Sequence, residues 1–390
     1  MADSNVQAPP LAQLLTHHSE KWRRFDRDVL PLPVAEMDFP IADPIRAVLA
    51  EMVAKSDLGY LGSVPELAAG YAKFAAARWG WSVDTAQLGV AADVGVAVVE
   101  VLRVFTKPGD TILINSPVYQ NFYNWINETH LTKIDLAFTR TGQESDDLNP
   151  WQLDLDALEK IYATGLRVHL LCSPHNPLGR VFSKGELTRI AEMAKKYGVL
   201  VLSDEIHAPL TYNSKDFTPF LSISDASREV GITLTAASKG WNIAGLKCAI
   251  IVTQNDVMNE KLKELPIAVH FRASILGAFA SAAAFADGEV WLDTVLKQLD
   301  YNRFLIRDLL REHLPTVTYH IPQNSYLGWL DLTSLNLGEN PSATLLEKGR
   351  VAFNPGHTYG SQCSQYVRFN FATSPEIITE AIARTVRTLE

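Results

Sequence analysis

The chain has 390 residues, 47% of them hydrophobic, and a formal net charge of -9 with a pI near 5.6. This length accommodates two domains, and the acidic balance excludes a nucleic-acid partner, because phosphate backbones are bound by basic surfaces. We expect no membrane partner, because the sequence has no run of about 20 apolar residues and no start typical of a signal peptide. The three cysteines cannot all pair, and reduced thiols predict a cytoplasmic location.

The N-terminal residues predict an arm rather than a core element. Residues 1 to about 30 are polar and mixed, and the prolines that follow favour an extended segment over 30–40, because each restricts the residue before it. A helix is expected over 44–54. We predict an N-terminal arm (1–45) that packs with the small domain, a large domain (46–285) and a small C-terminal domain (286–390).

From about residue 65 the sequence alternates helical patterns with short apolar strands. This alternation is typical of a mainly parallel sheet between helices. Ser183 and Glu186 form a capping box for a helix that ends at Gly198, a residue suited to the left-handed stop. The other expected helices are 65–79 and 95–105, and the expected strands are 88–91, 111–115, 168–172, 199–203, 232–237 and 248–252.

After residue 285 the pattern changes. Apolar residues recur at helical spacing over a long segment that ends at Pro315. Strand patterns at 317–319, 327–332 and 366–370 then alternate with helices, which predicts a separate α+β unit. The long helix is expected to join the two units.

Three expected strands are followed by unusual polar groups. Asn176 lies in a loop with two prolines after one strand, Asp204 ends the next, and Lys239 ends a third. The carboxyl ends of parallel strands meet at one edge of a sheet, so these side chains should gather there. A lysine at the end of a buried strand loses hydration, which lowers its pKa and makes it a usable nucleophile or base.

These three groups suit one cofactor, pyridoxal phosphate. Its aldehyde condenses with a lysine such as Lys239, and Asp204 would keep the pyridine nitrogen protonated so that the ring withdraws electrons. Asn176 would bind the ring 3-oxygen, and His207 could steady the same edge. Each residue alone also has an ordinary explanation: a surface lysine, an aspartate that caps a turn, or a core histidine. Their order on successive strand ends favours the cofactor. No metal centre is expected.

With these residues the sequence resembles the fold-type I, aspartate-aminotransferase-like superfamily. Further segments carry the resemblance from about residue 30 to the end: Gly59-Tyr60, Asp93-Val94-Gly95-Val96, Ser116-Pro117-Val118-Tyr119, Gly245-Leu246-Lys247 and Tyr366-Val367-Arg368-Phe369-Asn370. Val34-Ala35-Glu36-Met37-Asp38-Phe39, Ser203-Asp204-Glu205-Ile206-His207 and Ser238-Lys239-Gly240-Trp241-Asn242 look most like the MalY/PatB-type carbon–sulfur β-lyases, often called cystathionine β-lyases.

The resemblance implies a role for each matching residue. Lys239, Asp204 and Tyr119 would be catalytic, with the Tyr119 ring stacked on the pyridine. Arg368 and Ala35 would bind the substrate, the arginine through its carboxylate. The remaining cofactor contacts would come from Asn176, His207, Val94, Gly95, Ser238 and Lys247, and from Tyr60, which would reach the phosphate in the partner subunit of a homodimer with shared active sites.

Three positions depart from the family pattern. Pro33 stands where many of these lyases have tryptophan, Asp93 where they often have glycine, and Ala236 where a hydroxyl would help to hold phosphate. An acid near phosphate is unfavourable, so we expect Asp93 to point away and the amides of its neighbours to bind.

The function implied is a pyridoxal phosphate-dependent β-lyase of amino-acid metabolism and methionine biosynthesis. It would cleave cystathionine or a related cysteine thioether to a thiol (homocysteine), pyruvate and ammonia. A class I/II aminotransferase uses the same residues and is the main alternative. A regulatory or protein-binding member of the same fold is a third, against which the intact Lys239, Asp204 and Arg368 argue.

Overall fold

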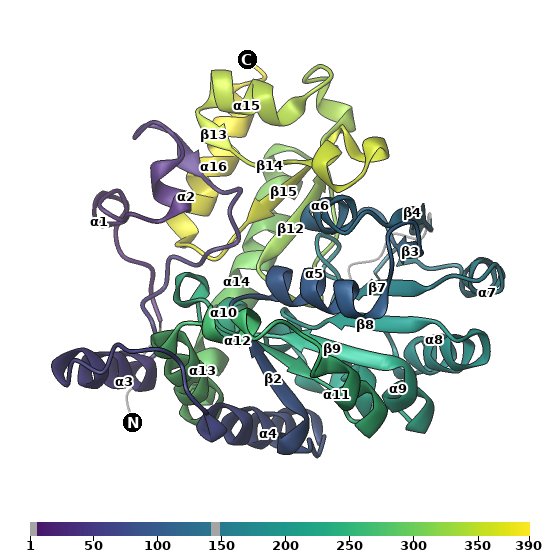
Figure 1. The fold of residues 1–390 in the computed structure, drawn as a ribbon. Helices are drawn as coiled ribbons and strands as arrows, with labels where there is room; N and C mark the ends of the chain where they lie inside the picture. The colour runs from purple at the N-terminus through teal and green to yellow at the C-terminus, as the bar shows by residue number, and fades with distance from the viewer. Residues whose placement is uncertain (1–5, 142–148) are drawn as a thin grey trace.

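A seven-stranded sheet forms the centre of the molecule, with strand order β2-β10-β9-β8-β7-β3-β4 (Figure 1). The structure is a computed structural model and describes residues 6–141 and 149–390. All pairs in the sheet are parallel except those of β10, which runs antiparallel to β2 and β9. The strands are β2 (Leu88–Ala91), β3 (Thr111–Ile114), β4 (Thr132–Asp135), β7 (Val168–Cys172), β8 (Leu200–Asp204), β9 (Gly231–Thr235) and β10 (Ala249–Val252).

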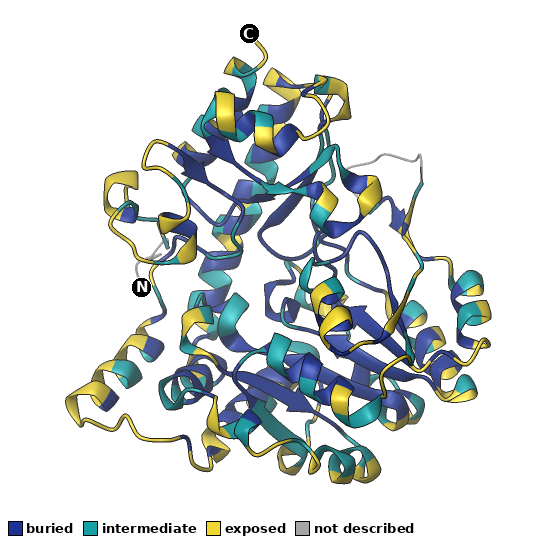
Figure 2. Cartoon of the chain, turned by 45° about the horizontal axis from the view of Figure 1, so that its top comes forward, coloured by how far each residue is buried: buried dark blue, intermediate teal, exposed yellow. Residues whose placement is uncertain are grey.

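Helices cover both faces of this sheet, because its central strands are apolar on both sides. In β8, Leu200 and Leu202 face the α5 side, whereas Val201 packs into the larger core on the other face. Buried strands and exposed outer helix faces are distinct in Figure 2. The helices before and within this layer are α3 (Asp43–Ala54), α4 (Pro65–Trp79), α5 (Val94–Phe105), α6 (Asn121–Glu128), α7 (Leu155–Tyr162), α8 (Lys184–Tyr197), α9 (Asp225–Val230), α10 (Ala237–Gly240), α11 (Asp256–Leu262), α12 (Ala268–Phe271) and α13 (Ile275–Asp287).

The C-terminal part forms a second, smaller α+β unit. The long helix α14 (Glu289–His313) leads into an antiparallel sheet of order β11-β12-β15-β14. Its strands are β11 (Thr318–Tyr319), β12 (Leu327–Asp331), β14 (Asn354–Pro355) and β15 (Tyr366–Asn370), and its other helices are α15 (Pro341–Gly349) and α16 (Pro375–Arg387). A short hairpin, β5 (Thr139–Arg140) with β6 (Trp151–Gln152), extends the large unit. The expectation of a mainly parallel sheet plus a smaller α+β unit is confirmed.

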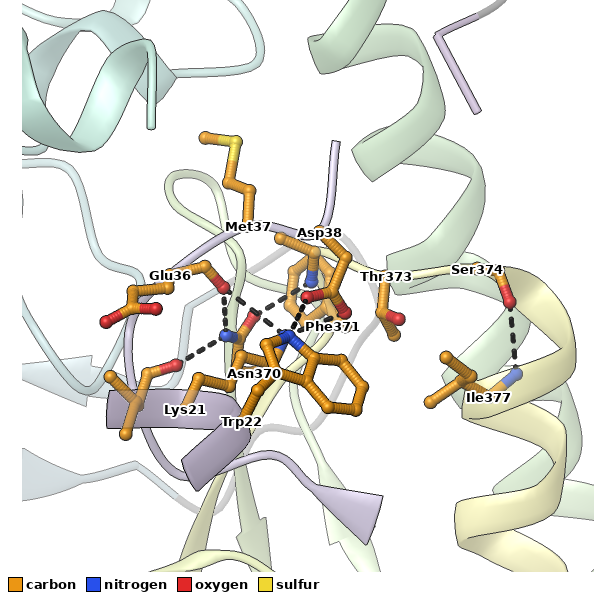
Figure 3. Close-up of polar contacts among 12 residues, drawn as sticks. Lys21, Trp22, Glu36, Met37, Asp38, Asn370, Phe371, Thr373, Ser374 and Ile377 are labelled. Carbon is orange, nitrogen blue, oxygen red and sulfur yellow. Dashed lines mark hydrogen bonds and ion pairs between the residues drawn. The ribbon is translucent and has the colours of Figure 1, made fainter. Parts of the chain in front are cut away.

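The N-terminal residues are more deeply packed than an arm of polar sequence suggests. They form α1 (Leu11–Leu14), α2 (Glu20–Arg23) and β1 (Leu30–Pro31), which pairs with β13 (Val351–Ala352) of the C-terminal unit. Lys21 and Asp38 form an ion pair of 2.8 Å with both side chains 1% exposed, and Trp22 Nε1 donates to the same carboxylate at 3.0 Å (Figure 3). Residues 1–5 of the expected arm lie outside the described residues, and the three domain ranges stay a prediction.

Local sequence signals predicted the bounds of most helices and strands to within a few residues. The expected helix 65–79 and strands 88–91, 168–172 and 366–370 match the structure, and Gly198 ends α8 with φ +70°. One expectation was wrong: β9 ends at Thr235, so Lys239 lies on the one-turn helix α10 rather than on the strand end. Among the described residues no single helix is long and apolar enough to cross a membrane; α13 and α14 meet that criterion only as a pair bent by 80°.

Candidate active site

A cavity of about 780 Å³ lies at the carboxyl ends of the central strands, bordered by the loop 33–35 and the C-terminal unit. Its lining includes the following residues expected from sequence: Ala35, Val94, Gly95, Tyr119, Asn176, Asp204, His207, Ser238, Lys239, Lys247 and Arg368. Residues separated by more than 300 positions thus meet in one place. Of the expected site residues, only Tyr60 is missing from the lining.

Lys239 is half-buried and lines the cavity. Its Nζ donates a hydrogen bond of 3.0 Å to the carbonyl oxygen of Ala35. Burial, followed by the nearby charge of Arg368, lowers the pKa of Lys239 to about 8. A minority of this amine is therefore neutral near physiological pH, far more than for an ordinary lysine, and the neutral form is the one that acts as a nucleophile or base.

Asp204 and His207 follow one another at the end of β8. Asp204 is 5% exposed, and its Oδ1 accepts from the backbone N–H of Ile206 at 3.1 Å. Burial raises the pKa of Asp204 to about 7, so this carboxyl is poised to share a proton with a basic nitrogen placed against it. Burial lowers the pKa of His207 to about 3, which keeps the ring neutral. Its buried Nδ1 has no hydrogen-bond partner within the described part of the chain.

Arg368 brings a buried cation from β15 to the same cavity. Its Nη1 donates to Asn176 Oδ1 at 3.2 Å and its Nη2 to the carbonyl oxygen of Pro33 at 2.7 Å. The side chain is 2% exposed, and its Nε finds no partner among residues 6–141 and 149–390. A buried guanidinium without a carboxylate partner is a site for an anionic ligand, which a carboxylate would satisfy in a bidentate fork.

Tyr119 presents its ring to the cavity from the segment before α6. Its hydroxyl accepts from Asn121 Nδ2 at 2.8 Å, and its ring lies edge-on to Trp125 with centroids 6.0 Å apart. Burial raises the pKa of Tyr119, so the hydroxyl stays protonated. The two contacts hold the ring in one orientation, as a stacking partner for a flat ligand requires.

The N-terminus of α5 opens into the other end of the cavity. Asp93 caps the helix by accepting from the Val96 N–H at 2.8 Å, which leaves Val94 and Gly95 as the first helical residues. Lys247 Nζ lies 3.2 Å from Asp93 Oδ2. The expectation that Asp93 points away was therefore wrong: its carboxylate faces the lysine that was expected to bind phosphate, because the capping geometry and the ion pair both hold it there.

Tyr60 lies apart from the cavity of its own chain. It sits in the loop between α3 and α4, and its side chain is 88% exposed. Its expected contact with the partner subunit stays a prediction.

Sequence reasoning missed the residues that hold the loop 33–38 over the cavity. The Tyr326 hydroxyl donates to the Ala35 carbonyl at 3.0 Å, and Asn370 Nδ2 donates to the Val34 carbonyl at 2.6 Å. Asn370 Nδ2 also donates to the Glu36 carbonyl at 2.6 Å (Figure 3). Trp125 and Arg272 also line the cavity. Asn370 lies in a segment that carries the family resemblance, but no local signal marks the others, because their role depends on contacts far along the chain.

The donor set fits pyridoxal phosphate. The cavity offers an amine of lowered pKa, a buried carboxyl, an aromatic ring and a helix N-terminus, which are the groups that an aldehyde, a pyridine nitrogen, a flat ring and a phosphate need. We call Lys239, Asp204, Asn176, His207 and Arg368 the ring end of the cavity, and Asp93, Val94, Gly95, Ser238 and Lys247 the phosphate end. Within the described ranges no three His, Cys, Asp or Glu side chains are placed to hold a metal ion.

Comparisons with known proteins agree with this geometry. The model of the family "Aminotransferase class I and II" matches residues 27–384. Cystathionine beta-lyase of Corynebacterium glutamicum is 34% identical, over 97% of this chain and 99% of that protein. Cystathionine beta-lyase PatB of Bacillus subtilis is 30% identical, over 92% of each chain. The crystal structure of cystalysin from Treponema denticola, which contains pyridoxal 5'-phosphate, has a TM-score of 0.91 and 28% identity, covering 100% of this chain and 99% of that one.

The family match spans most of the sequence, and the similar chains extend over nearly all of it. The resemblance to the aspartate-aminotransferase-like superfamily and its MalY/PatB branch is thereby confirmed. The chain belongs to the aminotransferase class I and II family and is a pyridoxal phosphate-dependent enzyme.

Proposed function

We propose that the chain is a carbon–sulfur β-lyase that cleaves cystathionine or related cysteine thioethers to a thiol, pyruvate and ammonia. The observation that supports it best is the ring end of the cavity: Lys239, Asp204 and Arg368 stand together there, in a chain similar over nearly its full length to proteins named cystathionine beta-lyase. Elimination from an amino acid needs an amine as base, an acid that keeps the cofactor ring protonated and a guanidinium that binds the carboxylate.

The two ends of the cavity would divide the work of holding the cofactor. At the ring end, Asp204 would lie against the pyridine nitrogen, Asn176 and His207 against the ring oxygen, and Tyr119 against the ring face. At the phosphate end, the anion would meet the first amides of α5, where the helix dipole favours negative charge. The residues proposed to bind phosphate are Val94, Gly95, Ser238, Lys247 and Tyr60 of the partner subunit.

The chain's own residues would then act in sequence on an L-amino acid. Arg368 fixes its α-carboxylate, and Ala35 borders the site through the loop 33–38. Lys239 Nζ, with its lowered pKa, accepts the proton from Cα. The bound cofactor supplies the electron-withdrawing ring that makes this proton acidic. The Asp204 carboxylate keeps the ring nitrogen protonated. The burial of Asp204 favours this pairing, because a buried carboxylate without a cationic partner is costly.

A sulfur on Cβ decides the products. The Cβ–S bond breaks, the sulfur leaves with the bonding electrons and takes a proton to become a thiol. The remaining three-carbon enamine reacts with water to give pyruvate and ammonia. The alternative, transamination, uses the same residues but needs a keto acid to complete each cycle, and the family description supports keeping it as the rival.

Pyruvate release without a keto acid separates these two functions. With L-cystathionine alone, we expect many equivalents of pyruvate per subunit in a coupled lactate dehydrogenase assay, and none from L-norleucine, which has no Cβ leaving group. No pyruvate, with glutamate accumulating only when 2-oxoglutarate is supplied and the thioether keto acid of cystathionine as the other product, would assign the chain as an aminotransferase.

We also propose a homodimer in which Tyr60 completes the partner's site. Tyr60→Phe should weaken cofactor binding in homodimers. Mixing it with Lys239→Ala should restore one tight, active site per two chains, because that site combines an intact Lys239 with an intact Tyr60 of the other chain. A fully active monomer in light scattering, or no restoration on mixing, would contradict the shared site.

A further inference from the structure

Asp93 places a negative charge where the cofactor phosphate is proposed to bind. Its two carboxylate oxygens have different partners: Oδ1 accepts from the Val96 N–H at 2.8 Å, and Oδ2 pairs with Lys247 Nζ at 3.2 Å. The carboxylate thus uses one amide of the α5 N-terminus and one cation of the phosphate end. Phosphate would bind to the same kinds of group.

The surroundings hold Asp93 in this position. A Cβ on Gly95 would lie 3.3 Å from Asp93 Oδ1 and 3.1 Å from the Trp125 ring, so the absence of a side chain at 95 leaves room for the carboxylate beside the indole. Asp93, Gly95, Trp125, Lys247 and Arg272 all line the cavity. The lining also carries Arg103, which is paired with Glu100 and Glu128, and Arg24, which is paired with Glu20.

We propose that Asp93 is a resident anion that competes with the cofactor phosphate for Lys247 and for the N-terminus of α5, and so sets the cofactor affinity. This inference rests on the proposed phosphate end. Bound phosphate shares Lys247 with Asp93 and lies close to the negative charge of Asp93. The cofactor therefore binds more weakly than it would without that charge. Among the described residues, the hydrogen bond and ion pair of the Asp93 side chain go to Val96 and Lys247 and not to the ring end, so we expect its effect on affinity rather than on the chemical step.

The side chains of Asp93 and Lys247 are 41% and 57% exposed, so water and salt screen their charges and the effect is moderate. Removing the charge of Asp93 should lower the dissociation constant of pyridoxal phosphate about tenfold, which corresponds to ~1.4 kcal/mol. The same change should strengthen binding of inorganic phosphate, which carries only the charge. Both gains should shrink at high ionic strength.

Asp93→Asn tests the proposal with little other change, because asparagine caps a helix as well as aspartate does. The matched control is Asp154→Asn, which removes the same charge from the cap of α7, outside the cavity. Dissociation constants of pyridoxal phosphate and of inorganic phosphate would be measured by titration calorimetry on cofactor-free protein at low and high salt. Asp93→Ser, another capping residue, provides a second variant if the first does not fold.

We expect tighter binding of both ligands by Asp93→Asn, unchanged binding by Asp154→Asn, and weaker binding by Lys247→Ala. If Lys247→Ala weakens binding but Asp93→Asn leaves it unchanged or weakens it, the competition is wrong and the phosphate end stands. If Lys247→Ala changes neither constant, the phosphate end itself is misassigned, and the role of Asp93 fails with it. Pyruvate assays are independent of both results, so the proposed reaction is judged separately.

Discussion

The ring end and the phosphate end of the cavity differ most in burial. Asp204 and Arg368 are 5% and 2% exposed, whereas the side chains of Asp93 and Lys247 are 41% and 57% exposed. Burial shifts the pKa values of Asp204 and Lys239 strongly, because a charge without water needs a partner. We therefore expect the buried end to provide reactivity, and the exposed end to adjust cofactor affinity through charges that salt can screen.

The largest effect is expected at the centre of the ring end. Lys239→Ala should lower turnover about 10⁴-fold, because the general base for the Cα proton is lost. Borohydride reduction of the wild-type enzyme followed by peptide mapping should place the cofactor on Lys239, and Lys247→Ala should keep that label. A label on any other lysine would show that the ring end is misassigned.

Asp204→Asn should retain the cofactor yet lower turnover about 10³-fold, because a neutral amide does not hold the ring nitrogen protonated. The matched control is Glu205→Gln, the neighbouring buried carboxyl, whose Oε1 accepts from Ser203, Phe220 and Thr233 away from the cavity. Turnover and cofactor dissociation constants would be measured for both. A near wild-type rate in Asp204→Asn would remove this residue from the mechanism.

The loop 33–38, which borders the cavity, is held in place by the buried ion pair of Lys21 with Asp38. Lys21→Met leaves Asp38 buried without its cation, so the free energy of unfolding in urea should fall by about 3 kcal/mol. Lys55→Met, which breaks an exposed pair with Glu51, is the control and should change stability little. Equal effects of the two substitutions would mean that burial does not distinguish these regions.

The smallest expected effect is a pH dependence. Only the neutral Lys239 amine attacks an aldehyde, and its pKa is lowered to about 8, so attachment of pyridoxal phosphate to cofactor-free protein should accelerate with pH and level off above pH 8. Below that value the rate should fall about tenfold per pH unit. Stopped-flow absorbance, normalised to the reaction of a free amine, measures it. A rate still rising steeply above pH 9 would indicate an ordinary lysine.

Much of the fold and of the ring end was predictable from sequence for a local reason. Apolar runs, capping residues and turn glycines indicated strands and helices within a few residues. The gathering of Asn176 and Asp204 near successive strand ends, and of Lys239 on the short helix after the next strand, followed from parallel topology. The resemblance to a known family then supplied Tyr119 and Arg368, which no spacing rule links to the others.

By itself the sequence determined which residues could carry the chemistry, because residue type and chain order are local facts. Only the tertiary structure decided where side chains point. It turned Asp93 toward Lys247, set Tyr326 and Asn370 under the loop 33–38, and buried Lys21 in a segment of polar sequence. These outcomes depend on partners more than 15 residues away, and side-chain direction is chosen by the burial and hydrogen bonds that such partners provide.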